Sequence, residues 1–241
     1  MQIKQRLEYP IWKTPYFCVV GFFIFFKLVR AGTLTLLIDK PFFNKKLNLT
    51  LKFLNFLIYS ENKDEIGKKL LRCLINLGPG YIKFGQALST RPDLVDKKTC
   101  EYLKKLQDDM EPFSSSIAKN IIEKENHDSI DNIFSSFDEK PIANASVAQV
   151  HTAILKSGES VAVKILKPDI KKKLFKDFIF FYWVSKCLEI AIPSIKRLKL
   201  SKNVEVLSEV SLNELDLTLE ASAAEEPVSY THLTLPTKEE V

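Results

Sequence analysis

The chain has 241 residues, enough for one large domain or two small ones, and 46% hydrophobic with 27% charged residues is typical of a globular protein rather than a disordered one. The net charge of +5 comes mostly from clustered lysines, which are typical of solvated helix faces and also suit an anionic membrane surface. Because the four cysteines and three histidines show no metal-ligand spacing, we expect reduced thiols and no metal site.

An apolar, aromatic run of eleven residues, 16–26, lies near the N-terminus. It is too short to span a bilayer, which needs about 20 residues, and Lys27 and Arg30 follow it instead of a signal-peptide cleavage site. Two predictions stay open. The run is either a helix in the membrane interface, with its basic residues at the headgroups, or a helix in the core of the domain.

Hydrophobic periodicity predicts helices in the first half of the chain and a small sheet after about residue 135. The predicted helices cover residues 47–59, 64–77, 81–90, 95–107 and 114–125. Alternating residues predict a hairpin of strands 147–154 and 160–166, with one more strand before Pro141. Helices are expected again from residue 168 and, as one long helix, over residues 201–226. The fold class is therefore α+β.

The second strand of the hairpin carries Ala162 and Lys164 on one face and Val161, Val163 and Ile165 on the other. The apolar face can bury in a core. The other face suits a nucleotide, because alanine leaves room for a flat base and the lysine ammonium reaches phosphate. The alternative is an edge strand with a solvated lysine.

The loop before this hairpin contains small residues where a protein kinase has a Gly-rich loop over the phosphates. Ala143, Asn144, Ala145 and Ser146 let the loop approach phosphates, but with less backbone freedom than glycines give. We therefore predict nucleotide binding here without standard protein kinase activity.

The predicted last helix carries the acidic residues Glu214, Asp216 and Glu220. Asp216 and Glu220 are i,i+4 neighbours, and like charges at that spacing cost a few tenths of a kcal/mol unless a cation is near. Lys164 is a candidate cation, as in the lysine–glutamate pair of kinases. A solvated acidic face is the alternative.

Gly85 lies inside the predicted helix 81–90, where a glycine costs about 1 kcal/mol relative to alanine. We therefore expect another segment to pack tightly against it. Lys83 and Gln86 are three residues apart and share one face of the same helix.

Together these features resemble the UbiB/ADCK family of atypical kinase-like proteins, over about residues 60–226. Lys83, Gly85 and Gln86 match the KxGQ motif of that family, and residues 89–94 and 105–109 resemble its flanks.

The second half of the chain carries the other motifs of the resemblance. Residues 143–151 resemble the Ala-rich loop of the family, with Asn144 where alanine is frequent, and Lys164 falls on its nucleotide lysine. Glu214 and Asp216 match its ExD motif, and Glu220 matches its αC glutamate.

The resemblance implies a kinase-like N-lobe, preceded by a helical segment that carries KxGQ and covers the site where a protein substrate would dock. Lys83 would contact Glu214 and phosphates across the pocket. Family members bind ATP with Mg²⁺ and support ubiquinone biosynthesis at membranes. The expected partners are ATP, membrane lipids or ubiquinone precursors and other ubiquinone-biosynthesis proteins, without nucleic acid. Because no Arg- and Ser-rich transit peptide is evident, we expect a bacterial protein. The resemblance implies a cytoplasmic location peripheral to the inner membrane.

We expect four segments, of which the second and third follow from the resemblance. They are a helical segment suited to the membrane interface (1–60), the KxGQ extension (61–130), the kinase-like N-lobe (131–226) and a tail that resembles a translated sequencing adapter and is expected to be non-native (227–241).

A kinase also needs a catalytic-loop Asp and Asn and a metal-binding Asp, which the fifteen residues after 226 have no room to supply. We therefore expect a truncated chain without a C-lobe, and no turnover. A non-enzymatic helical membrane-binding or scaffold module is the alternative function, and ATP binding separates the two.

Overall fold

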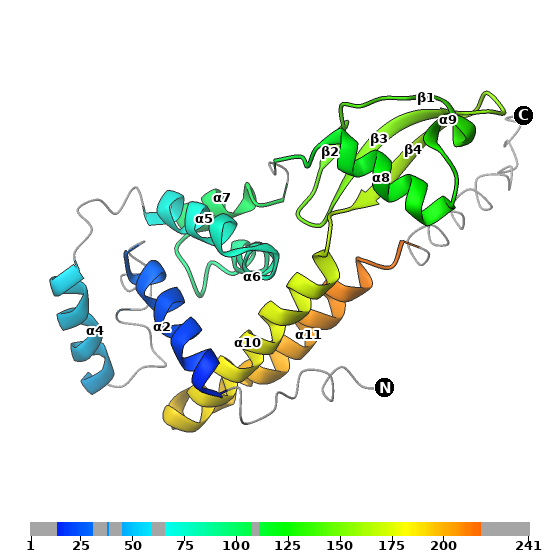
Figure 1. The fold of residues 1–241 in the computed structure, drawn as a ribbon. Coiled ribbons are helices and arrows are strands. Elements are labelled where there is room, and N and C mark those ends of the chain that lie inside the picture. The colour runs from blue at the N-terminus through cyan, green and yellow to red at the C-terminus, as the bar shows by residue number, and fades with distance from the viewer. Residues whose placement is uncertain (1–13, 31–37, 39–44, 59–65, 108–110, 218–241) are drawn as a thin grey trace, which may run out of the picture.

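The computed structural model describes residues 14–30, 38, 45–58, 66–107 and 111–217. Figure 1 shows a small sheet with two helices at one end of the molecule, and most of the other helices near a long helix, α10 (Ile170–Ala191). The helices before the sheet are α2 (Thr14–Arg30), α4 (Lys45–Ile58), α5 (Ile66–Leu77), α6 (Pro79–Ser89), α7 (Lys97–Lys104), α8 (Ser115–Asn126) and α9 (Ile130–Ile133). The five helices predicted for the first half of the chain are confirmed, with ends displaced by a few residues.

The sheet is antiparallel and has a central strand, β3. Its strands are β1 (Phe134–Phe137), β2 (Ala143–Asn144), β3 (Ala148–Leu155) and β4 (Ser160–Leu166). β3 pairs with β4 along one edge and with β1 and β2 along the other. The predicted hairpin and the additional strand are confirmed. The sequence does not predict β2, because two residues are too few to show a period.

After α10, a short 3₁₀ helix (Pro193–Leu198) leads into α11 (Leu200–Asn213). α11 lies beside α10 and runs back toward the sheet. The prediction of one helix over residues 201–226 is wrong, because α11 ends at Asn213. Leu215 turns into the core between α10 and α11, and burying this side chain favours a turn over a continued helix.

Because of this turn, the acidic residues predicted for one continuous helix do not all lie on α11. Asp216 follows the end of α11, and its N–H closes the turn on the carbonyl oxygen of Asn213 at 3.0 Å. The i,i+4 argument for Asp216 and Glu220 therefore loses the continuous helix on which it depended. Glu220 itself lies outside the described residues.

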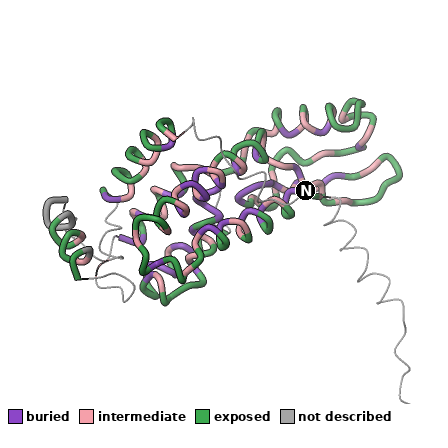
Figure 2. The backbone as a smooth tube through the Cα atoms, turned by 90° about the horizontal axis from the view of Figure 1, so that it is seen from below, coloured by how far each residue is buried: buried purple, intermediate pink, exposed green. Residues whose placement is uncertain are grey.

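α10 contributes to two cores. Around the middle of the helix, Phe180 and Trp183 pack with side chains of α2, α5 and α6. Near its N-terminal end, Leu174 and Phe178 pack with α11 and with the start of β3. A third core lies between the sheet and α8. Figure 2 shows the buried segments along the middle of the molecule, with exposed positions along the outer helices.

The aromatic run near the N-terminus is helical and lies in α2. Phe17 is buried on one side of α2, so this side belongs to the core, while the opposite side is exposed. Among the described residues, no helix is both long enough and apolar enough to cross a membrane.

Candidate functional site

β4 has one covered and one open face. Val163 and Ile165 pack in the core between the sheet and α8, where Ile165 is only 4% exposed. Ala162 is exposed and Lys164 is half-buried, and both alternate with the core residues. The small residue and the lysine therefore share the open face of the strand.

The register extends this open face across three strands. Lys164 pairs with Val150 of β3, and Val150 pairs on its other side with Ala143 of β2. Directly paired residues of antiparallel strands point to the same face, so these three residues form one row. Ala162, which pairs with Thr152, belongs to the next row on the same face. The sheet thus brings together the predicted residues Ala143, Ala162 and Lys164.

Asn144 points to the opposite face. It pairs with Gln149, which is fully buried and pairs in turn with Ile165 of the core. The Oδ1 atom of Asn144 is buried, and no described group donates a hydrogen bond to it. The structure therefore separates the Asn144 side chain from Lys164.

Ala145 and Ser146 form the turn between β2 and β3. Ala145 is exposed, and its N–H donates to the carbonyl oxygen of Ala148 at 2.8 Å. Ser146 is 4% exposed and lines a cavity of about 440 Å³. A volume of this size lies within the usual range for small-ligand sites.

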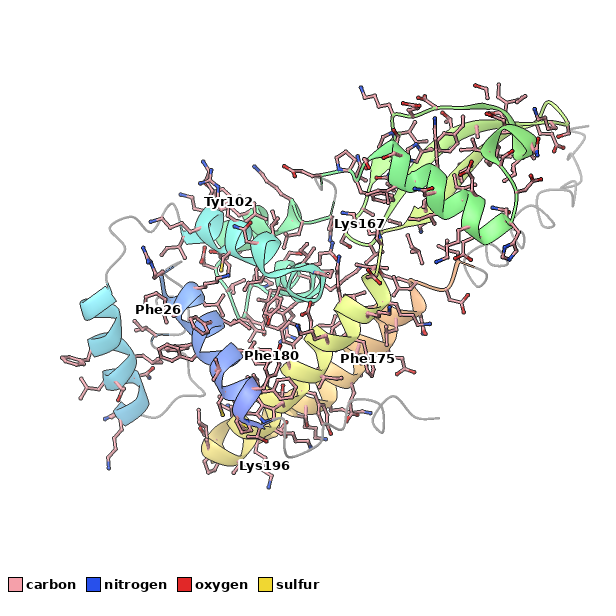
Figure 3. All side chains as sticks on the ribbon, viewed as in Figure 1. Phe26, Tyr102, Lys167, Phe175, Phe180 and Lys196 are labelled. Atoms are coloured by element: carbon pink, nitrogen blue, oxygen red, sulfur yellow. The ribbon has the colours of Figure 1, made fainter. Side chains whose placement is uncertain are left out.

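The cavity joins the predicted nucleotide loop to the helix that carries Lys83. Its walls include Gly78 and Pro79 at the start of α6, together with Lys167 and Ile170 at the start of α10. Burial lowers the pKa of Lys167, whose Nζ lies 3.5 Å from the carbonyl oxygen of Glu111. Figure 3 shows Lys167 where the chain leaves the sheet for α10. α6 therefore begins beside the Ala-rich loop.

A buried polar relay supports the loop from the core side. The Oε1 of Gln149 accepts a hydrogen bond from the N–H of Phe113 at 3.1 Å, and its Nε2 lies 2.8 Å from Nε2 of His151. The Nδ1 of His151 lies 2.8 Å from the carbonyl oxygen of Asp138. Because a side-chain amide nitrogen only donates and a carbonyl oxygen only accepts, His151 is the neutral tautomer with its proton on Nδ1.

The relay holds β3 to the end of β1 and to the segment before α8, and none of the sequence patterns described above predicts it. Gln149 and His151 are both fully buried. The available signal was a pair of polar residues at i and i+2 on the apolar face of a strand, since such residues need partners from elsewhere in the chain.

Lys83 of α6 reaches the segment that follows α11. Its Nζ forms an ion pair with the carboxylate of Glu214, with the lysine side chain 10% exposed and the glutamate side chain 44% exposed. The residues that match KxGQ and ExD are therefore in direct contact. Asp216 is exposed two residues further on.

Gly85 and Gln86 bind α6 to the end of α7. A Cβ atom at Gly85 would collide with Cδ1 of Leu106 and would lie 2.7 Å from Cδ1 of Leu74, so the expectation of tight packing is confirmed. Nε2 of Gln86 donates to the carbonyl oxygen of Leu106 at 2.8 Å. Leu106 thus connects the KxGQ residues of α6 with the stretch 105–109, which resembles a flank of the same motif in the family.

Asp177 of α10 caps the N-terminus of α6, where the N-cap residue Gly78 has no side chain to do so. Its Oδ2 accepts a hydrogen bond from the N–H of Gly80 at 3.0 Å. Burial raises the pKa of Asp177 to about 6. Burial, with the Asp177 charge, also raises the pKa of Tyr81. The sequence signal for this cap was a single acidic residue in an aromatic stretch of α10.

Known proteins resemble more than half of the chain. The model of the ABC1 atypical kinase-like domain matches residues 105–234. The "Probable protein kinase UbiB" of Shewanella pealeana is 42% identical over 173 residues, which are 71% of this chain and 32% of that protein. The protein of the same name from Aliivibrio fischeri is 43% identical over 160 residues, 66% of this chain and 29% of that protein. The one from Cellvibrio japonicus is 39% identical over 179 residues, 74% and 32% respectively. The chain spans about a third of the length of these curated relatives.

Proposed function

The chain belongs to the family of ABC1 atypical kinase-like domains, and from this premise we propose that it binds ATP on the open face of its sheet, as part of a protein that supports ubiquinone biosynthesis at the bacterial inner membrane. Its antiparallel sheet with flanking helices forms the N-lobe of this kinase-like unit. Residues 61–130, which contain α5 to α8, form the helical extension that carries the KxGQ residues.

The single observation that carries the proposal is the row formed by Ala143, Val150 and Lys164. A flat base needs small or apolar side chains beneath it, and Ala143 and Ala162 supply them at the open face. The phosphates need a positive charge at one end of that surface, and Lys164 supplies it. Ala145 and Ser146 lie in the turn between β2 and β3, at the end of the sheet that is nearer to Lys164 than to Ala162.

The contact of Lys83 with Glu214 suggests a regulatory role for α6. Because this lysine lies in a helix that begins beside the Ala-rich loop, α6 covers the region where a protein substrate would approach the nucleotide. Asp216 is exposed at the same turn and completes the proposed regulatory set with Gly85 and Gln86. Glu220 remains the proposed ion-pair partner of Lys164.

We assign Mg²⁺ to none of the residues that the structure describes. Among the described residues, no three His, Cys, Asp or Glu side chains are grouped so that they could hold a metal ion. Phosphoryl transfer requires a metal-binding Asp and a catalytic-loop Asp. We propose nucleotide binding for the described residues.

Isothermal titration of ATP into the chain tests the proposal. Replacement of the half-buried lysine by an uncharged side chain of similar length, Lys164→Met, should weaken ATP binding by about tenfold or more, because a charge-assisted hydrogen bond contributes about 1.5–3 kcal/mol. Lys156→Met, an exposed lysine at the β3–β4 turn, is the matched control and should leave affinity unchanged. Equal affinities of the two variants would refute the assignment.

The alternative function, a non-enzymatic helical membrane-binding or scaffold module, gains support from one feature of the described residues, the exposed aromatic side of α2. ATP titration separates it from the first proposal, since a pure scaffold gives no heat of binding.

A further inference from the structure

α2 has two apolar sides, and the described residues pack against only one of them. On the packed side, the ring of Phe17 lies 6.0 Å from that of Phe180 and 5.6 Å from that of Trp183. The side chains exposed on the remainder of the helix are Tyr16, Val19, Phe22, Phe23, Phe25 and Phe26. Figure 3 shows Phe180 between α10 and α2, and Phe26 on the side of α2 away from α10. Packing within the described fold therefore leaves one apolar side of α2 exposed.

The exposed residues form a continuous stripe. Positions 19, 22, 23 and 26 are separated by three or four residues and so lie one above another on a helix. Phe22 and Phe23 are 67% and 62% exposed. A contiguous aromatic surface of this kind is rare on monomeric soluble proteins and marks an interaction surface.

Basic side chains of α2 and α4 accompany the stripe and indicate the kind of partner that it fits. Lys27 and Arg30 follow the stripe at the C-terminal end of α2, and the guanidinium of Arg30 lies 5.7 Å from the centre of the Phe26 ring. α4 adds Lys45, Lys46 and Lys52. All five basic side chains are exposed, and neither helix contains an acidic residue.

Such a surface matches an anionic bilayer better than it matches a second copy of the chain. Two copies meeting through this stripe would bring their basic residues together, and like charges repel. An anionic bilayer offers hydrocarbon to the rings and negative headgroups to the lysines and arginine. α4 exposes Leu49 and Phe53, four residues apart, in the same way.

We propose that the exposed stripe of α2, flanked by the basic residues of α2 and α4, docks on the surface of an anionic membrane. α2 lies in the interface plane, with its phenylalanines among the acyl chains and its basic residues at the phosphates. This inference rests on the proposed peripheral location of the protein, and it is independent of ATP binding.

Vesicle flotation of the whole chain tests the apolar part. Phe22→Ser with Phe23→Ser should weaken binding to vesicles of equal parts phosphatidylcholine and phosphatidylglycerol by about 10- to 100-fold, because two aromatic side chains no longer enter the bilayer. The matched control, Ile142→Ser with Val210→Ser, replaces two exposed apolar side chains, one directly before β2 and one in α11. This variant should bind like the unchanged chain.

The charge part has its own pair of variants. Lys27→Gln with Arg30→Gln should weaken binding to the mixed vesicles by about tenfold and should leave the weak binding to pure phosphatidylcholine unchanged. Lys140→Gln with Lys156→Gln, exposed lysines near the sheet, serves as the control. Circular dichroism checks that every variant is folded.

Three outcomes would overturn the inference. If the unchanged chain does not float with the mixed vesicles, both the docking surface and the peripheral location are wrong. If it floats but the Phe22 and Phe23 variant floats equally well, the location stands and α2 is not the surface. If sedimentation velocity shows a dimer that this variant dissociates, and no vesicle binding, the stripe is a contact between copies.

Discussion

The motif residues lie in two regions, the open face of the sheet and the contacts that α6 makes with its neighbours, which we call the junction. The two regions are built in opposite ways. At the junction, Lys83, Gly85 and Gln86 are each held by a partner from a distant part of the chain. On the sheet, Ala162 is exposed and Lys164 is half-buried. A surface that binds a ligand must leave room for it, whereas a contact that positions a helix must fill its space. We therefore propose that the sheet binds the ligand and that the residues of α6 position their helix.

Gly85→Val should break the junction most strongly. The added side chain would meet Leu74 and Leu106, which are both almost completely buried and have little room to move. We expect the free energy of unfolding to fall by about 3 kcal/mol, measured by urea denaturation. Ala87→Val, at an exposed position of the same helix, should cost only about 0.5 kcal/mol. Similar losses in both variants would mean that Gly85 is not tightly packed.

Gln149→Leu should be the next most damaging change, because it acts behind the open face. It would leave the N–H of Phe113 and Nε2 of His151 buried without their partner. The expected loss is about 2–3 kcal/mol of unfolding free energy. The exposed Gln107→Leu is the control and should change stability little. A fully stable Gln149→Leu protein would show that the relay does not support the sheet.

Asp177→Asn tests the cap on α6 through pH. Burial raises the Asp177 pKa from 3.8 to about 6, so the folded state holds this proton more tightly than the unfolded state does. The stability that this group contributes is therefore present below pH 4 and is lost as pH rises to about 6. Asparagine still accepts from the N–H of Gly80 but carries no charge.

The Asn variant should consequently lack this decline and should be about 1–3 kcal/mol more stable than the unchanged chain at pH 7. Urea denaturation between pH 4 and pH 7 measures both curves, with the exposed Asp131→Asn as the control. Parallel curves for the Asp177 variant and the unchanged chain would contradict the assignment.

The ion pair of Lys83 with Glu214 should give the smallest effect. A double-mutant cycle with Lys83→Met and Glu214→Gln should give a coupling energy of about 1 kcal/mol, since the lysine is largely buried but the glutamate is partly exposed. The exposed pair of Lys119 and Glu139, at 2.6 Å, offers a matched cycle and should give less. Equal couplings would remove the distinction between a positioning contact and an ordinary surface pair.

The sequence predicts the features that depend on one segment of the chain, and it does not predict the contacts between distant segments. The alternation of Ala162 and Lys164 with Val163 and Ile165 follows from period two alone, and the cost of Gly85 in a helix indicates a close neighbour. The side of the sheet on which Asn144 lies depends on β2, which is too short to be recognised.

The partners of Gly80 and Phe113 could not be predicted for a different reason. Asp177 reaches Gly80 across 97 residues of chain, and Gln149 reaches Phe113 across 36. Contacts of this length depend on how the helices and the sheet pack, and the period of any one segment carries no information about them. The end of α11 at Asn213 has the same origin, because Leu215 turns toward a core formed with α10.

Hydrogen–deuterium exchange of the chain with and without ATP tests the central claim most directly. If the open face binds the nucleotide, the backbone amides of residues 143–148 and of β4 should exchange more slowly in the presence of ATP, while those of α2 should not change. Unchanged exchange in β4, or protection confined to the helices before the sheet, would contradict the assignment of ATP to the row of Ala143, Val150 and Lys164.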